Sequence, residues 1–179
     1  MGRTLVSDLR PVRNLVNLQE LLLSEIPVSN IEPISELKNL EMLDIGSTQV
    51  TDLKSIKGLL NLRGLSAYDT QISDLKPVRE LKKLQELIFS SPGVSDLEPI
   101  KNLTNIETLY LAKTSVSDLE PMRGLFNLKR LILNETQIYS LEPLKELINL
   151  QELYITGCNI SDQQVEDLQK ALPNLKIVR

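Results

Sequence analysis

The 179-residue chain is predicted to fold as an α/β solenoid with a parallel β-sheet along one side. Three observations support this prediction: one phrase recurs every 22 residues, apolar residues alternate in its first part, and they are spaced by three in its second part. Alternation is the period of a strand with one buried face, whereas spacing by three suits a short 3₁₀ turn. We expect a single domain over residues 1–179.

Each copy of the phrase opens on an aliphatic residue and continues as L-x-x-L-x-L. The openings are Leu18, Leu40, Leu62, Leu84, Ile106, Leu128 and Leu150. Because residues 22 places apart then stand above one another, the short strands stack in parallel. We therefore expect a partial repeat over 1–17, six 22-residue repeats over 18–149, and a longer terminal repeat over 150–179.

The return segments carry recurrent proline, serine and aspartate. Proline occurs early in the segment, where a missing N–H costs little. Serine and aspartate precede it and can accept hydrogen bonds from its first free N–H groups, and Ser95/Glu98 and Ser117/Glu120 have the spacing of a capping box. We interpret these polar residues as caps rather than catalysts. The recurrent prolines are Pro33, Pro77, Pro99, Pro121 and Pro143.

The two ends depart from the repeat. Residues 161–172 place Val165, Leu168 and Leu172 at helical spacing behind a Ser161/Gln164 capping box, which predicts an α-helix. Residues 175–178 then start a further strand. The chain opens in mid-phrase with Thr4 at an inward polar position, and no N-terminal capping helix is legible. We expect either a fragment of a longer protein or an uncapped N-terminal end that pairs end to end with another copy.

The stretch from Ile72 to Leu84 resembles the cadence I-S-D-L-x-P-L-x-x-L-x-N-L of bacterial internalin-type leucine-rich repeats, and the resemblance covers nearly the whole chain. It implies a horseshoe or arc with the sheet on its concave face, a convex side of 3₁₀ and irregular structure, and a grip on another protein. The family's inward asparagine is replaced here by threonine or cysteine, and a hydroxyl can do part of its work. Ile26 and Pro92 lack such a donor, so the turns after the first and fourth strands should differ locally. The replacements are Thr48, Thr70, Thr114, Thr136 and Cys158.

Composition excludes several function classes. A net charge of −4 and a pI near 5.0 argue against nucleic acid as a partner. The 36 leucines imply an aliphatic core, but no apolar run is long enough to span a bilayer. Without histidine, and with Cys158 as the single cysteine, we expect no catalytic residues, no metal site and no cofactor. The sequence carries no recognisable targeting signal and therefore does not indicate a cellular compartment.

The residues between the inward pairs of each strand should face solvent on the concave side. They are Leu22, Asp44, Ser66, Ile88, Tyr110, Ile132 and Tyr154. The last four form an apolar ladder about 15 Å long, flanked by Glu86, Thr108, Arg130 and Glu152 on one side and by Ser90, Ala112, Asn134 and Thr156 on the other. We predict that a partner binds at Ile88, Tyr110, Ile132, Tyr154, Tyr68, Glu86, Arg130 and Glu152. The alternative is that isoleucine and tyrosine simply favour exposed strand positions.

A basic column also recurs on the convex side, and glutamate recurs at the position three residues earlier in the repeat, as Glu32, Glu98, Glu120 and Glu142. We interpret these charges as acid at the start and base at the end of each helical turn. Lys54 and Lys76 replace the acid in two copies. Together with Lys82 and Lys83 they form a modest basic patch, which leaves an anionic partner as an alternative there. The column is Arg13, Lys57, Arg79, Lys101, Arg123 and Lys145.

Two functions fit these observations. The first is a non-enzymatic module that binds a protein or peptide on its concave face. The alternative is a spacer or a regulatory or sensor segment of a larger multidomain protein. An enzyme that cleaves polysaccharide needs a carboxylate pair in a cleft, and Asp44, Glu86 and Glu152 are too dispersed for that.

Overall fold

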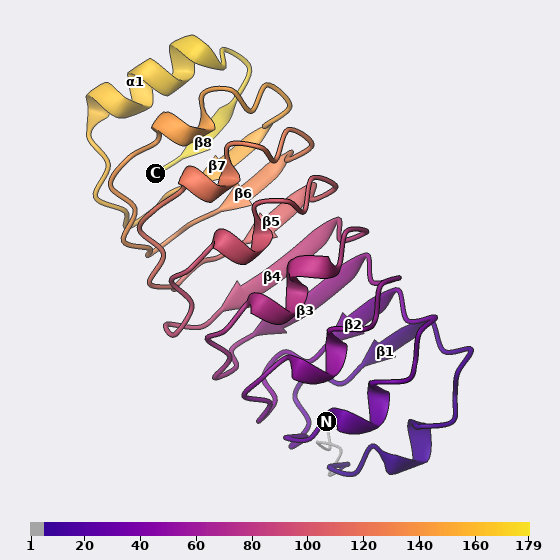
Figure 1. Cartoon of the computed structure of the whole chain (residues 1–179). Coiled ribbons are helices and arrows are strands. Elements are labelled where there is room, and N and C mark those ends of the chain that lie inside the picture. Colours follow the sequence, from indigo (N-terminus) through magenta and orange to yellow (C-terminus); the bar gives the residue numbers. More distant parts are fainter. Residues whose placement is uncertain (1–5) are drawn as a thin grey trace.

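The computed structural model describes residues 6–179, and its strands form one sheet of eight parallel strands (Figure 1). Strand order in the sheet is the order in the chain, so every strand pairs with its neighbours in sequence. The strands are β1 (Glu20–Leu22), β2 (Met42–Asp44), β3 (Gly64–Tyr68), β4 (Glu86–Ser90), β5 (Thr108–Tyr110), β6 (Arg130–Ile132), β7 (Glu152–Tyr154) and β8 (Lys176–Val178). This is the predicted solenoid.

Short 3₁₀ turns run along the side opposite the sheet, and one α-helix lies at the C-terminal end (Figure 1). Proline stands in the first positions of most of these turns, as its fixed φ and missing N–H allow. The turns are η1 (Arg10–Val12), η2 (Glu32–Ile34), η3 (Lys54–Ile56), η4 (Lys76–Glu80), η5 (Glu98–Ile100), η6 (Glu120–Met122) and η7 (Glu142–Leu144), and the helix is α1 (Asp162–Ala171).

The core is a single aliphatic column between the sheet and the 3₁₀ turns. Leu87, Leu109 and Leu131 are register partners on successive strands, and each is 0% exposed. Phe89 is the largest fully buried side chain. Because each coil buries its leucines mainly against the coils before and after it, stability depends on neighbours rather than on any isolated repeat.

The inward threonine hydroxyls donate hydrogen bonds to turn carbonyls, as the sequence predicts. Thr48 donates to the carbonyl of Ile45 at 2.6 Å, and Thr114 donates to that of Leu111 at 2.7 Å. Thr70 and Thr136 make the equivalent bonds. Each buried turn carbonyl thus has a donor within its own coil, which removes the cost of leaving it unpaired.

The turns after the strands share a residue with positive φ, and the fourth turn is the exception. Ser91 stands at the equivalent position there, but it is absent from the positive-φ residues of the described chain. This confirms the predicted local difference beside Pro92. In the first turn, by contrast, Glu25 keeps the left-handed conformation, and the local change beside Ile26 is a Val28 N–H to Ile26 carbonyl bond of 2.8 Å. The recurrent positions are Glu25, Ser47, Asp69, Lys113, Glu135 and Gly157.

Aspartate caps most of the return segments, whereas η2 is capped by Asn30 and η7 by the hydroxyl of Ser140. The carboxylate of Asp96 accepts from the backbone N–H of Glu98 at 2.9 Å, and Asp118 accepts from Glu120 at the same distance. The predicted Ser95/Glu98 and Ser117/Glu120 boxes do not form, because the aspartate lies two residues before the turn and reaches its N–H first.

Helix α1 begins as predicted, at Ser161, whose hydroxyl accepts from the N–H of Gln164. The Gln164 side chain does not return to Ser161. It instead donates to the carbonyl of Tyr139 at 3.0 Å and accepts from the N–H of Leu141 at 3.2 Å, which ties the helix to the preceding coil. The further strand predicted at 175–178 is β8.

A ladder of asparagines links the coils just before the strands. The amide of Asn127 donates to the carbonyl of Thr104 at 2.9 Å, and that of Asn149 donates to Phe126 at 2.8 Å, each 23 residues back. Asn39, Asn61 and Asn105 repeat this bond. Lys83 takes the asparagine's place in one coil and donates to the Asn61 amide oxygen at 2.7 Å.

At the N-terminal end, the inward residues Leu18, Leu21 and Ile26 are only partly buried. Leu15 and Val16 beside them are half-exposed. Thr4, which we predicted at an inward polar position, lies outside the described residues.

Candidate functional site

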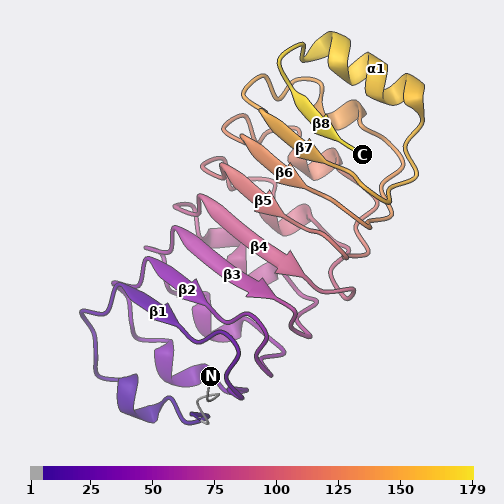
Figure 2. The ribbon, with the colours of Figure 1, turned by 180° about the vertical axis from the view of Figure 1, so that it is seen from behind.

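Figure 2 shows the sheet from its solvent-facing side, which is called the concave face below. This face carries the predicted apolar ladder in one row. Ile88 is the register partner of Tyr110, Tyr110 of Ile132, and Ile132 of Tyr154. All four side chains are half-buried, and none is packed into the core. Their alignment follows from the 22-residue period, because equal spacing in sequence places equivalent residues opposite each other on parallel strands.

A polar network borders the row at its C-terminal end. The Arg130 guanidinium on β6 pairs with the Glu152 carboxylate on β7 at 2.6 Å, and the Tyr154 hydroxyl donates to the same carboxylate at 3.1 Å. The Arg130 bond, followed by that of Tyr154, lowers the pKa of Glu152, and the same contact raises the pKa of Arg130. These bonds hold the ring of Tyr154 in its place at the C-terminal end of the row.

This network was not anticipated from the sequence, although its three members were. Arg130 and Glu152 are separated by 22 residues and have opposite charge, so the repeat alone places them side by side. Glu152 and Tyr154 are two apart on one strand and therefore share a face. Reading the outward residues as pairs across strands would have found the contact.

Glu86 and Tyr68, the other two predicted site residues, lie at the edge of the row rather than in the network. Glu86 is half-buried on β4 and makes no ion pair with any of residues 6–179. Tyr68 ends β3 and belongs to the neighbouring column of outward residues. A Cβ at Gly46 would lie 2.1 Å from the Tyr68 ring, so that ring covers the turn after β2.

Met42 and Gly64 form a second pair of this kind. A Cβ at Gly64 would meet the Met42 side chain at 2.4 Å, so Met42 lies across the next strand. Both glycines are therefore positions where a neighbour's side chain occupies the place of a Cβ. The row itself continues toward the N-terminus as polar Ser66 and Asp44 before it reaches Leu22, which is 65% exposed.

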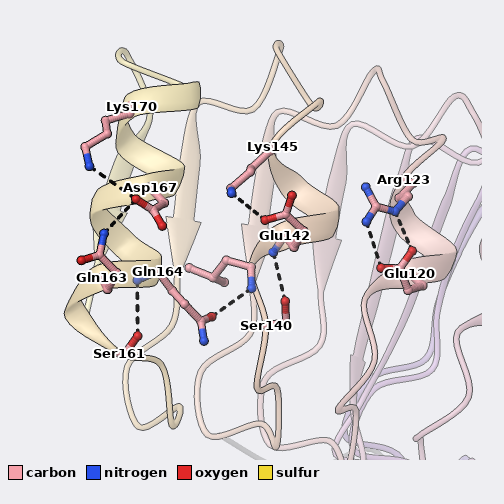
Figure 3. A network of polar contacts seen from close by, with 11 residues as sticks. Glu120, Arg123, Ser140, Glu142, Lys145, Ser161, Gln163, Gln164, Asp167 and Lys170 are labelled. Atoms are coloured by element: carbon pink, nitrogen blue, oxygen red, sulfur yellow. Dashed lines mark hydrogen bonds and ion pairs between the residues drawn. The ribbon is translucent and has the colours of Figure 1, made fainter.

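Charges on the convex side pair as the sequence suggested in the C-terminal coils (Figure 3). Glu120 contacts Arg123 at 2.5 Å, which lowers the pKa of Glu120, and Glu142 contacts Lys145 at 2.5 Å. Glu98 and Lys101 form the same pair at 2.6 Å. Pairs three residues apart on exposed turns stabilise each coil slightly.

Two other exposed features complete the surface. Phe126 and Ile148 are exposed at equivalent positions in the loops before β6 and β7, and Ile148 borders a surface pocket of about 210 Å³ with Ala171, Leu172 and Pro173. The Cys158 thiol donates to the carbonyl of Leu133 in the preceding coil at 3.0 Å, which is the carbonyl that Thr136 also bonds, so it does not repeat the threonine bond within its own turn.

Residues 6–179 contain no group of three histidine, cysteine, aspartate or glutamate side chains arranged to hold a metal ion. In the same residues, no helix has the length and apolar character needed to cross a membrane. Every buried side-chain N or O atom described has a hydrogen-bond partner. The polar groups of the described core are therefore all accounted for by the fold.

The stacked coils, the single parallel sheet and its open face define a solenoid repeat protein. Comparison with known proteins names the kind of repeat. A family model for leucine-rich repeats in two copies matches residues 16–58 and 126–170. Among curated protein sequences, no match is found.

Three solved structures illustrate the similarity. An internalin C2 from Listeria monocytogenes is 34% identical, with a TM-score of 0.81 over 90% of this chain and 69% of that chain. An internalin InlF from the same species is 24% identical, with a TM-score of 0.78 over 97% and 57% of the two chains. A plant peptide hormone receptor, RGFR1, in complex with RGF2 is 21% identical, with a TM-score of 0.75 over 96% and 30%.

The chain belongs to the leucine-rich-repeat family, and its array is of the internalin type. It spans little more than half of the internalin InlF chain and less than a third of the receptor chain. Arrays of this family are generally non-enzymatic modules for protein–protein interaction.

Proposed function

We propose that the chain binds a protein or peptide partner on its concave face, through the apolar row Ile88, Tyr110, Ile132 and Tyr154. One observation carries this proposal: four half-exposed apolar side chains lie on successive strands in register. A continuous apolar strip with a polar border is the usual anatomy of a protein interface.

The composition of the row supports the same function. Tyrosine and arginine dominate the energy of most interfaces, because each offers a large contact area together with a hydrogen-bonding group. The Tyr154 ring is already held by its bond to Glu152, and Glu152 by Arg130. Binding to a residue that is fixed in advance costs less side-chain entropy than binding to a mobile one.

The border explains how the surface selects its partner. Glu86 lies beside the row and pairs with no base among the described residues, whereas Arg130 and Glu152 neutralise each other. We expect the partner to present an apolar strip with a positive charge near Glu86. The plant receptor with the same fold is seen in complex with RGF2, which is an instance of this architecture holding another molecule.

The experiment compares what the array retains before and after the row is removed. Tyr110→Ser with Tyr154→Ser removes both aromatic rings, and Tyr139→Ser is the matched control because Tyr139 is 62% exposed in a loop outside the sheet. Proteins retained by the wild type are purified, and their affinity for the wild type, the control and the double variant is measured directly. We expect at least ~100-fold weaker binding, about ten-fold per tyrosine.

Circular dichroism and urea unfolding verify that all three proteins are folded. A partner that binds the double variant as tightly as the wild type contradicts the assignment to the concave face.

A further inference from the structure

The convex side has one region, at η3 and η4, where two bases of the recurrent column lack an acidic partner among the described residues, although Lys54 beside them pairs with Asp52 at 3.2 Å. Four bases of the recurrent column pair with an acid. Lys101, Arg123 and Lys145 each pair with a glutamate of their own turn, and Arg13 pairs with Glu32. Lys57 and Arg79 make no ion pair with any of residues 6–179. The cause lies in the sequence, where Lys54 and Lys76 stand in the place of the acid.

These cations surround a pocket. Lys57, Lys76 and Arg79, together with Pro77 and Glu80, line a surface pocket of about 280 Å³ on the outside of η3 and η4. Asp74, which follows the cap pattern, accepts the backbone N–H of Lys76 at 2.9 Å but makes no ion pair with that ammonium group. Three cations therefore converge on the pocket against a single carboxylate.

The excess of positive charge is local. Segments 52–61 and 74–83 hold more lysine and arginine than aspartate and glutamate, whereas the equivalent segments 30–39, 96–105, 118–127 and 140–149 hold fewer. Like charges on adjacent coils repel one another and would be more stable with acids between them. The fold does not require this cluster of bases, since equivalent turns in other coils carry a glutamate that pairs with the base.

We propose that this pocket binds an acidic segment of a protein partner, with the Arg79 guanidinium gripping a carboxylate and Lys57 and Lys76 adding charge on either side. A guanidinium bonds a carboxylate through two parallel N–H groups, and an ammonium group contributes a compact point charge. A chain with net charge −4 repels long polyanions, so a short acidic run suits the patch better than nucleic acid or an anionic membrane.

The pocket is on the opposite side of the coils from the apolar row, so this proposal does not rest on the concave face. Loss of one site leaves the other intact. A protein partner that occupies both would reach around the edge of the middle coils, from η3 and η4 to the row on β4 to β7.

The test uses a variant that the repeat itself supplies. Lys76→Glu installs the residue found at Glu98, Glu120 and Glu142, where it pairs with the base three residues later. We expect the new glutamate to pair with Arg79 and close the pocket. The control, Lys113→Glu, has the same charge change at an exposed position where Glu25 and Glu135 occupy the equivalent place.

A fluorescein-labelled hexaglutamate peptide is titrated into the intact chain at low salt and again at 0.5 M NaCl. We expect saturable binding to the wild type that high salt abolishes. Lys76→Glu should weaken binding by about ten-fold or more, since it removes one charge-assisted contact and adds a repulsive one. Lys113→Glu should bind within about two-fold of the wild type.

Three outcomes overturn the proposal: no binding by the wild type at low salt, unchanged binding by Lys76→Glu, or equal losses in both variants. Inorganic phosphate, a short single-stranded RNA and phosphatidylserine vesicles are titrated in parallel. Tighter binding of any of these than of hexaglutamate, lost in Lys76→Glu, assigns the pocket to that anion instead of an acidic peptide.

Discussion

The two halves of the concave face share one backbone and differ in what they show to solvent. Strands β5 to β7 present Tyr110, Ile132 and Tyr154 as an open row. Strands β2 and β3 present Asp44 and Ser66 in the same row. The flanking columns of the N-terminal half are closed over by Tyr68 above Gly46 and by Met42 above Gly64.

This difference shows that the outward residues, rather than the buried ones, determine what a repeat protein can bind. The buried positions are nearly identical from coil to coil, because each must fill the same space against its neighbours. The outward positions have no such constraint. Two surfaces of different chemistry therefore sit on one scaffold, and substitutions should separate the scaffold from the surface.

The largest effect is expected from breaking the shared scaffold at its middle. Leu109 is 0% exposed, and its register partners are Leu87 and Leu131. Leu109→Asp buries an unpaired carboxylate and should lower the free energy of unfolding by about 4 kcal/mol or more. Urea unfolding followed by circular dichroism measures the loss.

If the two halves form one cooperative scaffold, both halves of Leu109→Asp unfold in the same transition, as reported by one probe in each half. Hydrogen exchange resolves the strands one by one. Native-like protection of β1 and β2 alongside an unfolded β5 and β6 would show instead that the halves fold independently.

The next effect separates the halves. Gly46→Ala places a methyl group 2.1 Å from the Tyr68 ring, which must then leave its place over the turn after β2. We expect a loss of about 2 kcal/mol, the usual cost of overpacking. Gly124→Ala is the matched control, because the new Cβ meets only ordinary contact at 3.8 Å, and glutamate fills the equivalent positions Glu36 and Glu146.

Thermal unfolding compares the two alanine variants. An equal change in Tm would mean that Tyr68 does not depend on Gly46 for its place. A crystal structure of Gly46→Ala should show Tyr68 turned toward solvent.

A smaller effect tests whether the turns are equivalent in both halves. Thr48→Val and Thr114→Val each remove the hydroxyl that bonds a turn carbonyl, at 2.6 Å and 2.7 Å respectively. Each should cost about 1 kcal/mol, because the carbonyl is left unpaired in a buried turn. Chemical denaturation is sufficient to measure both values. Costs that differ by more than about twofold would contradict the view that the scaffold is uniform.

The smallest effect concerns the polar border of the open half. Arg130→Gln should raise the pKa of Glu152, because Arg130 is the main cause of its lowered value. A carboxyl group whose pKa is lower in the folded chain stabilises the fold above its unfolded pKa, and this contribution disappears as pH falls through the folded value. In Arg130→Gln that acid-induced loss should shrink.

NMR titration of the Glu152 side-chain carboxyl group measures the shift without dependence on stability. Glu86 in the same column serves as the internal control, since Arg130 does not bond it. An unchanged Glu152 titration would show that the ion pair is not formed in solution.

Most of the fold follows from the sequence because the repeat is strict. Leu18 through Leu150 at intervals of 22 determine which residues stack, and the register of the strand pairs from β1 to β7 agrees with that spacing. In the β7–β8 pair, Glu152 instead faces Lys176, 24 residues on, because α1 lengthens the terminal repeat. The same arithmetic placed Ile88, Tyr110, Ile132 and Tyr154 in one row. A period in sequence becomes a column in space, and no energy calculation is needed for that step.

What escaped prediction depends on side-chain reach rather than on periodicity. The capping box at Ser95 and Glu98 fails because Asp96 reaches the same N–H first. The rings and chains of Tyr68 and Met42 extend over neighbouring strands, and sequence spacing gives no information about which rotamer they take. The pocket at Arg79 depends equally on side-chain placement.

The asparagine ladder makes the length of this protein adjustable. Each asparagine amide donates to a carbonyl 23 residues back, as Asn149 does to Phe126, so this bond joins a coil to its immediate predecessor alone. Excising residues 106–127 would bring Thr104 into the place of Phe126 and leave the bond intact. Gene duplication or deletion in steps of 22 codons can therefore lengthen or shorten the molecule, and the junctions between coils that carry the asparagine keep this bond.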